Sequence, residues 1–190
     1  MRITGGVGRG LPLQTPRGDK TRPATDQMRE ALFSSLGNWI EGKVVLDLFA
    51  GTGSYGLEAA SRGAARVSLV ERDAKALQAL KQNVGVLQKG FFSAGLPFPE
   101  LAVTRGDARK PTIWPGGGYD LVFIDPPYRD VAEVGPEIMI ALATLKGGAP
   151  IRVAWETAGD QALDFPGWVL WKSIGKEKKD SPRVRVFEPK

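Results

Sequence analysis

The sequence predicts an α/β protein whose doubly wound, Rossmann-like sheet is mostly parallel and carries an antiparallel strand near its C-terminal edge. Three observations predict this fold. Short apolar runs alternate along the chain with segments of helical period, which is typical of parallel sheets covered by helices. A glycine turn follows the first apolar run, as in nucleotide-binding sheets. The chain then ends on strands without a further helix of comparable length, which indicates antiparallel pairing.

Each element is predicted from its own local pattern. A first helix is expected from Thr25, as N-cap, to Gly37, where the glycine ends it. Apolar side chains at three- and four-residue spacing predict helices over 54–61, 74–87 and 134–145, the last closed by Gly147-Gly148. Short apolar runs predict strands over 44–49, 66–70, 101–103, 119–124, 151–155, 169–174 and 184–187. Segments 90–100 and 111–118 contain prolines and glycines and are expected to be loops.

Charge is unevenly distributed along the 190 residues, whose formal net charge is +5. Residues 1–22 carry a net charge of +4, and residues 172–190 also carry +4, so the middle is slightly acidic. Two basic ends around an acidic body suggest that the termini hold a polyanion, although solvated tails would give the same pattern. Residues 1–24 are therefore expected to form a basic N-terminal arm, and residues 25–190 a single domain.

The composition excludes several kinds of chemistry, because the chain has no Cys and no His. Disulfides, thiolate nucleophiles, Cys/His zinc sites and imidazole bases are all ruled out. We expect no metal, so any catalysis must use carboxylates, hydroxyls, backbone groups or cations. No apolar run reaches membrane-spanning length, and no secretory signal is recognisable, so we expect no membrane association and a cytoplasmic location.

The most informative motif is Asp125-Pro126-Pro127-Tyr128, which follows the apolar run 121–124. Two prolines end that strand, because neither can donate a ladder hydrogen bond. The carboxylate of Asp125 and a carbonyl freed by the prolines can accept both N–H bonds of one planar amino group. Tyr128 offers a flat face on which a nucleobase can stack. A strand followed by an ordinary turn is the simpler interpretation of the same residues.

A second motif, Gly-x-Gly-x-x-Gly at 51, 53 and 56, follows the first strand. Such turns let a ligand approach the backbone closely but do not identify it. Glu71, 20 residues after Gly51, is placed to accept both hydroxyls of a ribose. Asp47 lies within the strand before the turn, where a pyrophosphate would be repelled. A cationic cofactor without phosphate, S-adenosylmethionine, is favoured instead, with Asp47 near its methionine end.

Acids at successive strand ends complete the predicted cofactor site. Asp107, beside Ala108, follows the third strand and can accept from an adenine amino group. The residues expected to bind S-adenosylmethionine are Asp47, Phe49, Gly51, Gly53, Glu71, Asp107 and Ala108.

In this order, Asp47-x-Phe49-Ala-Gly-Thr-Gly53, Glu71, Asp107 and Asp-Pro-Pro-Tyr resemble a class I S-adenosylmethionine-dependent methyltransferase that acts on amino groups. The basic beginning (Arg2-Ile-x-Gly-Gly, Arg9-Gly10) and the segment Thr21-Arg-Pro-Ala-Thr-Asp-Gln-Met-Arg-Glu30 narrow the resemblance. The chain is similar to the RsmD family, bacterial enzymes that methylate N2 of a guanine in small-subunit ribosomal RNA.

The resemblance implies roles for further residues. Asp125 and Pro126 would hold the guanine amino group and Tyr128 would stack on the base, which must leave its own stack to enter the site. Arg2, Arg9, Arg17, Lys20 and Arg22 would contact phosphates. The expected partner is ribosomal RNA or a small-subunit assembly intermediate, and the enzyme is expected to act as a monomer.

Three other functions are compatible with parts of the sequence. An NAD-dependent oxidoreductase would use the glycine turn and Glu71 but leave Asp47 and the proline motif without a role. A methyltransferase for another amino group, such as that of adenine in DNA, would use the same catalytic residues. A non-catalytic RNA-binding assembly factor on the same fold would not need acids at every strand end.

Overall fold

The computed structural model describes residues 1–16, 23–127, 130–145, 152–159, 161–178 and 181–190. Within these ranges one sheet has the strand order β3-β2-β1-β4-β5-β7-β6. Its strands are β1 (Val44–Leu48), β2 (Arg66–Glu71), β3 (Glu100–Arg105), β4 (Leu121–Ile124), β5 (Arg152–Ala158), β6 (Trp168–Gly175) and β7 (Pro182–Pro189). The α-helices are α1 (Pro23–Leu36), α2 (Ser54–Ser61), α3 (Ala74–Ser93) and α4 (Val131–Thr144). Two 3-10 turns, η1 (Gly37–Ile40) and η2 (Pro111–Ile113), complete the regular structure.

The sheet has the predicted mixed topology. The strands from β3 to β5 pair in parallel, and β7 then pairs antiparallel with both β5 and β6. This confirms the doubly wound, mostly parallel sheet with antiparallel pairing at its C-terminal edge. Because five strands run in the same direction, their carboxyl ends meet along one edge, where open α/β sheets bind ligands.

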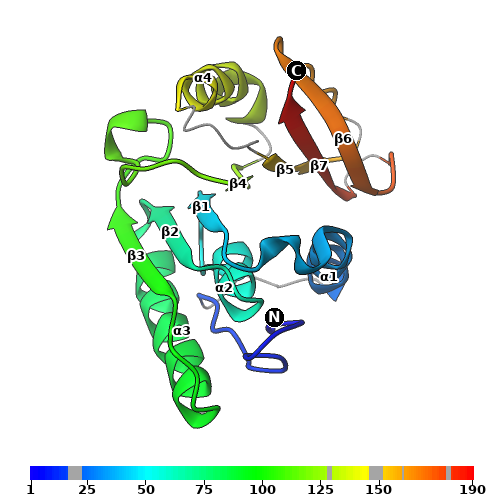
Figure 1. Ribbon diagram of the computed structural model, residues 1–190. Coiled ribbons are helices and arrows are strands. Elements are labelled where there is room, and N and C mark those ends of the chain that lie inside the picture. The colour runs from blue at the N-terminus through cyan, green and yellow to red at the C-terminus, as the bar shows by residue number, and fades with distance from the viewer. Residues whose placement is uncertain (17–22, 128–129, 146–151, 160, 179–180) are drawn as a thin grey trace.

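The two faces of the sheet bury separate hydrophobic cores, because successive side chains of a strand point to opposite faces. On β4, Leu121 and Phe123 belong to the core under α1, α2 and α3, whereas Val122 and Ile124 belong to the core under α4. Figure 1 shows this division, with α1, α2 and α3 on one side of the sheet and α4 on the other.

Three predicted helix boundaries were wrong. The helix expected over 134–145 begins three residues earlier, at Val131. The glycines expected to close it, Gly147 and Gly148, lie outside the described residues. The first helix begins at Pro23, so Thr25 lies inside it and is not its N-cap. Proline is common at the first helical position because its missing N–H would be unpaired there anyway.

The helix predicted to end at residue 87 instead runs to Ser93, into the segment expected to be a loop. Phe91 is buried on the same face as Leu87 and packs edge-on against Phe98. This burial outweighs the cost of about 1 kcal/mol for a glycine inside the helix. After the C-cap residue Ala94, Gly95 takes a positive φ of 68° and the N–H of Leu96 donates to the Phe91 carbonyl, which closes the end of the helix.

Residues 1–16 pack against α2 and α3 rather than extending into solvent. Ile3 and Leu13 are buried in the core. The Glu58 carboxylate of α2 accepts from the Thr4 N–H and hydroxyl at 2.8 and 2.7 Å. It also pairs with Arg62 and with the buried Arg29 of α1, which donates in turn to the Arg2 carbonyl. This first part of the arm is therefore fastened to the domain by a buried ionic network.

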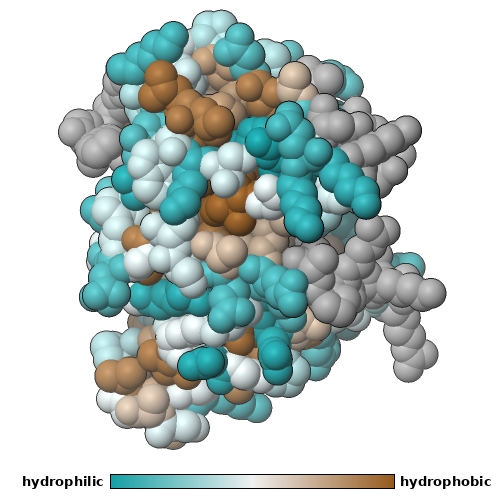
Figure 2. Space-filling model, turned by 90° about the vertical axis from the view of Figure 1, so that its right-hand side faces the viewer, coloured by the Kyte–Doolittle hydropathy of each residue, from teal (hydrophilic) through white to brown (hydrophobic). Residues whose placement is uncertain are grey.

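The outer strand β6 exposes apolar side chains, including Val169, Leu170 and Trp171. The Arg152 guanidinium lies between the rings of Trp39 and Trp171, 4.3 and 4.2 Å from their centroids. Figure 2 shows this side of the molecule, on which hydrophobic and hydrophilic groups are interspersed. Among the described helices, none is long and apolar enough to cross a bilayer.

Candidate active site

A cavity of about 860 Å³ opens where the parallel strands end. This volume suits a small organic ligand. Five of the predicted site residues line it, namely Phe49, Glu71, Ala108, Asp125 and Pro126. Its other lining residues are Pro16, Val70, Arg72, Asp73, Lys75, Ala76, Gly106, Pro127 and Glu156. Asp47, Gly51, Gly53 and Asp107 do not line the cavity, although Gly51 donates to Glu71 and Asp107 lies between the lining residues Gly106 and Ala108.

The glycine turn after β1 has an unusual backbone. Phe49 has φ of 60° and is the one non-glycine residue with positive φ in the described ranges. Gly51 and Gly53 follow with φ of 54° and 87°. Such conformations strain residues with a Cβ and cluster at ligand sites. The turn thus presents the Phe49 side chain and its backbone to the cavity.

Asp47 is buried and acts on the helix that follows the turn. Its Oδ2 accepts from the Gly56 N–H at 2.8 Å, in the first turn of α2. Gly53, the N-cap of α2, has no side chain for this purpose, so Asp47 caps the helix from the strand. Burial raises the pKa of Asp47 to about 7, the Glu71 charge adds to this increase, and the Gly56 hydrogen bond opposes it.

Glu71 fixes the turn from the end of β2. Its Oε2 accepts from the Gly51 N–H at 2.7 Å, and its Oε1 accepts from the N–H groups of Arg72 and Asp73, each at 2.7 Å. A carboxylate offers about four acceptor sites, so these bonds leave about one open. Since Glu71 lines the cavity, that site can accept one hydroxyl of a ligand, whereas the sequence predicted that Glu71 accepts both ribose hydroxyls.

The carboxylate of Asp107 forms an ion pair with Arg109 on the same loop. The Arg109 guanidinium donates to both carboxylate oxygens, with Nη2–Oδ2 at 2.6 Å and Nε–Oδ1 at 2.9 Å. These hydrogen bonds lower the pKa of Asp107 to about 2. Gly106 and Ala108, on either side of it, line the cavity.

Asp125 and Pro126 stand at the end of β4, as the motif predicted. Burial, followed by the nearby carboxyls of Glu156 and Asp47, raises the pKa of Asp125 well above its usual range. No described residue donates a hydrogen bond to the Pro126 carbonyl, whereas the Asp130 N–H donates to the Pro127 carbonyl at 2.8 Å. A carboxyl and an open carbonyl are thus available together in the cavity wall.

Sequence reasoning missed Glu156, which lies within β5 beside Asp125 and lines the same cavity. The Tyr55 hydroxyl of α2 donates to its Oε2. Burial raises the pKa of Glu156, and the Tyr55 hydrogen bond and the Arg29 charge oppose that increase. The signal was present, because Glu156 immediately follows the predicted strand 151–155, and the other site acids were found at strand ends.

Of the predicted phosphate contacts, Arg2 and Arg9 are exposed in the described part of the arm and line a shallow hollow of about 330 Å³ together with Asp26 and Glu30. The remaining predicted contacts (Arg17, Lys20 and Arg22) and the stacking residue Tyr128 lie outside the described residues.

The arm and the glycine turn are joined through Asn83 of α3. Its Nδ2 donates to the carbonyls of Gln14 and Thr52 at 3.0 and 2.9 Å, and its Oδ1 accepts from the Gln14 N–H at 2.7 Å. Asn83 is fully buried. Two residues further along the arm, Pro16 reaches the cavity.

The strand order, the glycine turn and the acids around the cavity define a class I methyltransferase fold. A family model described as conserved hypothetical protein 95 matches residues 1–179. Ribosomal RNA small subunit methyltransferase D of Haemophilus influenzae is 33% identical over 175 residues, which cover 90% of this chain and 86% of that protein. The Escherichia coli protein of the same name is 38% identical over 129 residues, covering 68% of this chain and 61% of the relative.

The solved structure of yhhF from Escherichia coli is 30% identical to this chain, with a TM-score of 0.79, and the match covers 100% of this chain and 98% of that one. The chain belongs to the conserved hypothetical protein 95 family, and this confirms the predicted resemblance to RsmD.

Proposed function

We propose that this protein transfers a methyl group from S-adenosylmethionine to the exocyclic N2 of a guanine in 16S ribosomal RNA. The observation that carries this proposal is the pairing of Asp125 with the open Pro126 carbonyl in the cavity wall, two acceptors suited to one amino group. The names of the family relatives supply the class of RNA.

The cavity suits the cofactor. When bound, S-adenosylmethionine supplies an activated methyl group on a cationic sulfonium. Glu71, Asp125 and Glu156 line the cavity, and a bound cation would favour the ionised forms of Asp125 and Glu156, whose pKa values burial raises. Glu71 would accept one ribose hydroxyl, and Phe49 and Ala108 would contact the base. Asp47, Gly51 and Gly53 shape the turn that would hold the ligand, and Asp107, which also accepts from Arg109, would accept from the adenine amino group.

Asp125 and Pro126 act on the nucleophile. Guanine N2 is a weak nucleophile because its lone pair is delocalised into the ring. Hydrogen bonds from the amino group to Asp125 and to the Pro126 carbonyl fix the nitrogen and favour a more pyramidal geometry. Alignment of this kind supplies much of the rate acceleration in bimolecular reactions. A cation in the cavity lowers the pKa of Asp125, so that the ionised carboxylate can take the amino proton.

The RNA is held outside the cavity. Arg2 and Arg9, with Arg17, Lys20 and Arg22 further along the arm, would bind phosphates near the site. Tyr128 would stack on the extruded base. The partner is ribosomal RNA, free or in a small-subunit assembly intermediate, and the enzyme acts in the cytoplasm as a monomer, with residues 1–24 as its RNA-binding arm.

The proposal is tested with purified protein, radiolabelled S-adenosylmethionine and 16S RNA from a strain that lacks the gene. We expect label in N2-methylguanosine after nuclease digestion and mass spectrometry. Label in N6-methyladenine, or transfer to DNA but not to RNA, would identify a different amino-group methyltransferase. Binding of the RNA with no transfer under any of these conditions would indicate an assembly factor.

A further inference from the structure

Two carboxyl side chains face the cavity from neighbouring strands. Ile124 and Trp155 are register partners in the parallel pair of β4 and β5, so the residues that follow them, Asp125 and Glu156, stand at the same level. Both line the cavity. A nucleobase whose amino group is bound to Asp125 therefore has Glu156 beside it.

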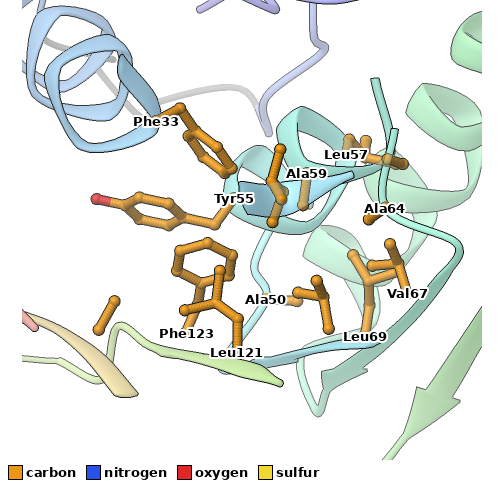
Figure 3. Packing of buried hydrophobic residues seen from close by; sticks show 14 of the residues in the cluster. Phe33, Ala50, Tyr55, Leu57, Ala59, Ala64, Val67, Leu69, Leu121 and Phe123 are labelled. Carbon is orange, nitrogen blue, oxygen red and sulfur yellow. The ribbon is translucent and has the colours of Figure 1, made fainter. Parts of the chain in front are cut away.

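Glu156 is held in place from beneath by Tyr55, which donates its hydroxyl to Oε2. The Tyr55 ring is stacked on Phe123, with centroids 5.0 Å apart and planes 21° apart. Figure 3 shows this ring between Phe33 and Phe123, with its hydroxyl directed away from them. Among the described residues, Tyr55 is the one donor to the Glu156 carboxylate, and it binds Oε2. The carboxylate is thus fixed through one oxygen and open through the other.

The amino groups of the nucleobases differ in the ring atom next to them. In guanine, the N2 amino group lies between N1–H, which is a hydrogen-bond donor, and N3, which is an acceptor. In adenine and cytosine, the amino group is adjacent to a ring nitrogen that is an acceptor. The Tyr55 hydrogen bond and the nearby Arg29 charge oppose the effect of burial and favour the ionised form of Glu156. An ionised carboxylate beside the amino site attracts guanine and repels the lone pair of the other two bases.

We propose that Glu156 selects guanine by accepting a hydrogen bond from N1–H while Asp125 and the Pro126 carbonyl hold the amino group. Tyr55 is a positioning residue that fixes the Glu156 carboxylate for this contact. The inference rests on the proposed amino-group methylation and assigns its base specificity to a residue outside the proline motif. Sites built to bind a donor reject analogues that lack it, because their own polar group is left unpaired.

The experiment uses an RNA fragment that contains the methylated nucleotide, made with either guanine or 2-aminopurine at that position. 2-Aminopurine keeps the amino group but has an acceptor in place of N1–H. Single-turnover rates are measured for wild type, Glu156→Ala, Glu156→Gln and Tyr55→Phe. We expect wild type to prefer guanine strongly. The guanine-to-2-aminopurine rate ratio should fall by about 10- to 100-fold in Glu156→Ala, the effect of one charged hydrogen bond.

The other variants distinguish a direct contact between Glu156 and the base from a general effect on the structure. A glutamine side chain can turn its amide to suit either base, so Glu156→Gln should also lose the preference, and its near-identical shape protects the fold. Tyr55→Phe should lower the ratio by a smaller factor. Glu133→Gln, an exposed charge loss on α4, should leave the ratio unchanged. A wild-type ratio retained in both Glu156 variants would overturn the inference, whereas a wild-type enzyme that cannot methylate the guanine RNA at all would overturn the proposed function instead.

Discussion

At the residue scale, the site is a group of buried acids with different tasks. Glu71 and Asp47 are occupied mainly by backbone N–H groups and hold the glycine turn and the start of α2. The side chains of Asp125 and Glu156 accept no hydrogen bond from a described backbone N–H group, and both face the cavity. The acids that stabilise the turn and the acids that meet the ligand can therefore be tested separately.

Asp125 provides the first prediction. Asp125→Ala should lower the single-turnover methylation rate by about 30- to 150-fold, the effect of losing one hydrogen bond to a charged group of roughly 2–3 kcal/mol. Affinities for S-adenosylhomocysteine and RNA should be retained. Asp125→Asn keeps an acceptor but not a base, so substantial activity in this variant would assign the effect to alignment and not to proton transfer. A wild-type rate in Asp125→Ala would refute the mechanism.

The raised pKa of Asp47 predicts that the stability of the protein depends on pH. Its pKa is about 7 in the folded protein and 3.8 in the unfolded chain, so the folded state retains a proton that the unfolded state releases. Its contribution to stability is complete below about pH 4 and is lost as the pH rises to about 7. Asp47→Asn keeps the acceptor for the Gly56 N–H and cannot ionise.

Urea unfolding without cofactor should therefore find Asp47→Asn close to wild type at pH 4 and more stable by roughly 3–4 kcal/mol at pH 8. The difference between the two proteins isolates this residue from other titrating groups. A difference that does not vary with pH would show that Asp47 is ionised throughout.

At the element scale, the long helix α3 provides a matched pair of neighbouring residues. Phe91 is 5% exposed and packs in the core, whereas Phe92 is 86% exposed. Phe91→Ala should lower the free energy of unfolding by about 3–5 kcal/mol, and Phe92→Ala by no more than about 0.5 kcal/mol. Chemical denaturation of both variants measures this. Equal effects would mean that the last turns of α3 do not pack as described.

The same helix shows where sequence patterns reach their limit. The mostly parallel sheet, its antiparallel C-terminal edge and the limits of α2 followed from alternating apolar runs and the glycine turn, because those signals are local. The end of α3 did not, because Gly90 is locally unfavourable in a helix and the gain from burying Phe91 depends on Phe98 across the fold. The start of α1 was misplaced because Thr25 was favoured over Pro23, although both are start signals.

The site was predictable to a similar degree. Strand ends placed Glu71, Asp125 and Ala108 at the cavity, because parallel strands end along one edge. The burial of Asp47 beneath the turn and the pairing of Asp107 with Arg109 depend on side-chain directions that spacing does not reveal. The contact of Tyr55 with Glu156 joins residues 101 positions apart and has no local signal.

At the scale of the whole molecule, the basic arm predicts how binding to RNA depends on salt. Replacing both Arg2 and Arg9 with Ala should weaken RNA binding and flatten the plot of log affinity against log salt concentration. The slope should change by about 0.7–0.9 for each phosphate that the arm no longer neutralises. The affinity for S-adenosylhomocysteine should not change.

A control removes the same charge from the exposed surface of α3 through Lys81→Ala and Lys89→Ala. The comparison is made by fluorescence anisotropy of a labelled rRNA fragment at several salt concentrations. An unaltered slope in the arm variant, or an equal change in the control, would show that these arginines do not contact phosphate.

The buried amide of Asn83 links the proposed RNA-binding arm to the turn beside the cofactor cavity. Its side chain binds the arm at Gln14 and the glycine turn at Thr52. A movement of either segment would therefore break a hydrogen bond to the side chain that also holds the other segment. A ligand that steadies the turn also steadies the arm, and coupling between two sites is reciprocal. RNA should then bind more tightly while the cofactor is in place, and the cofactor should bind more tightly by the same factor while RNA is bound. Whichever ligand leaves first, its departure would weaken the binding of the other.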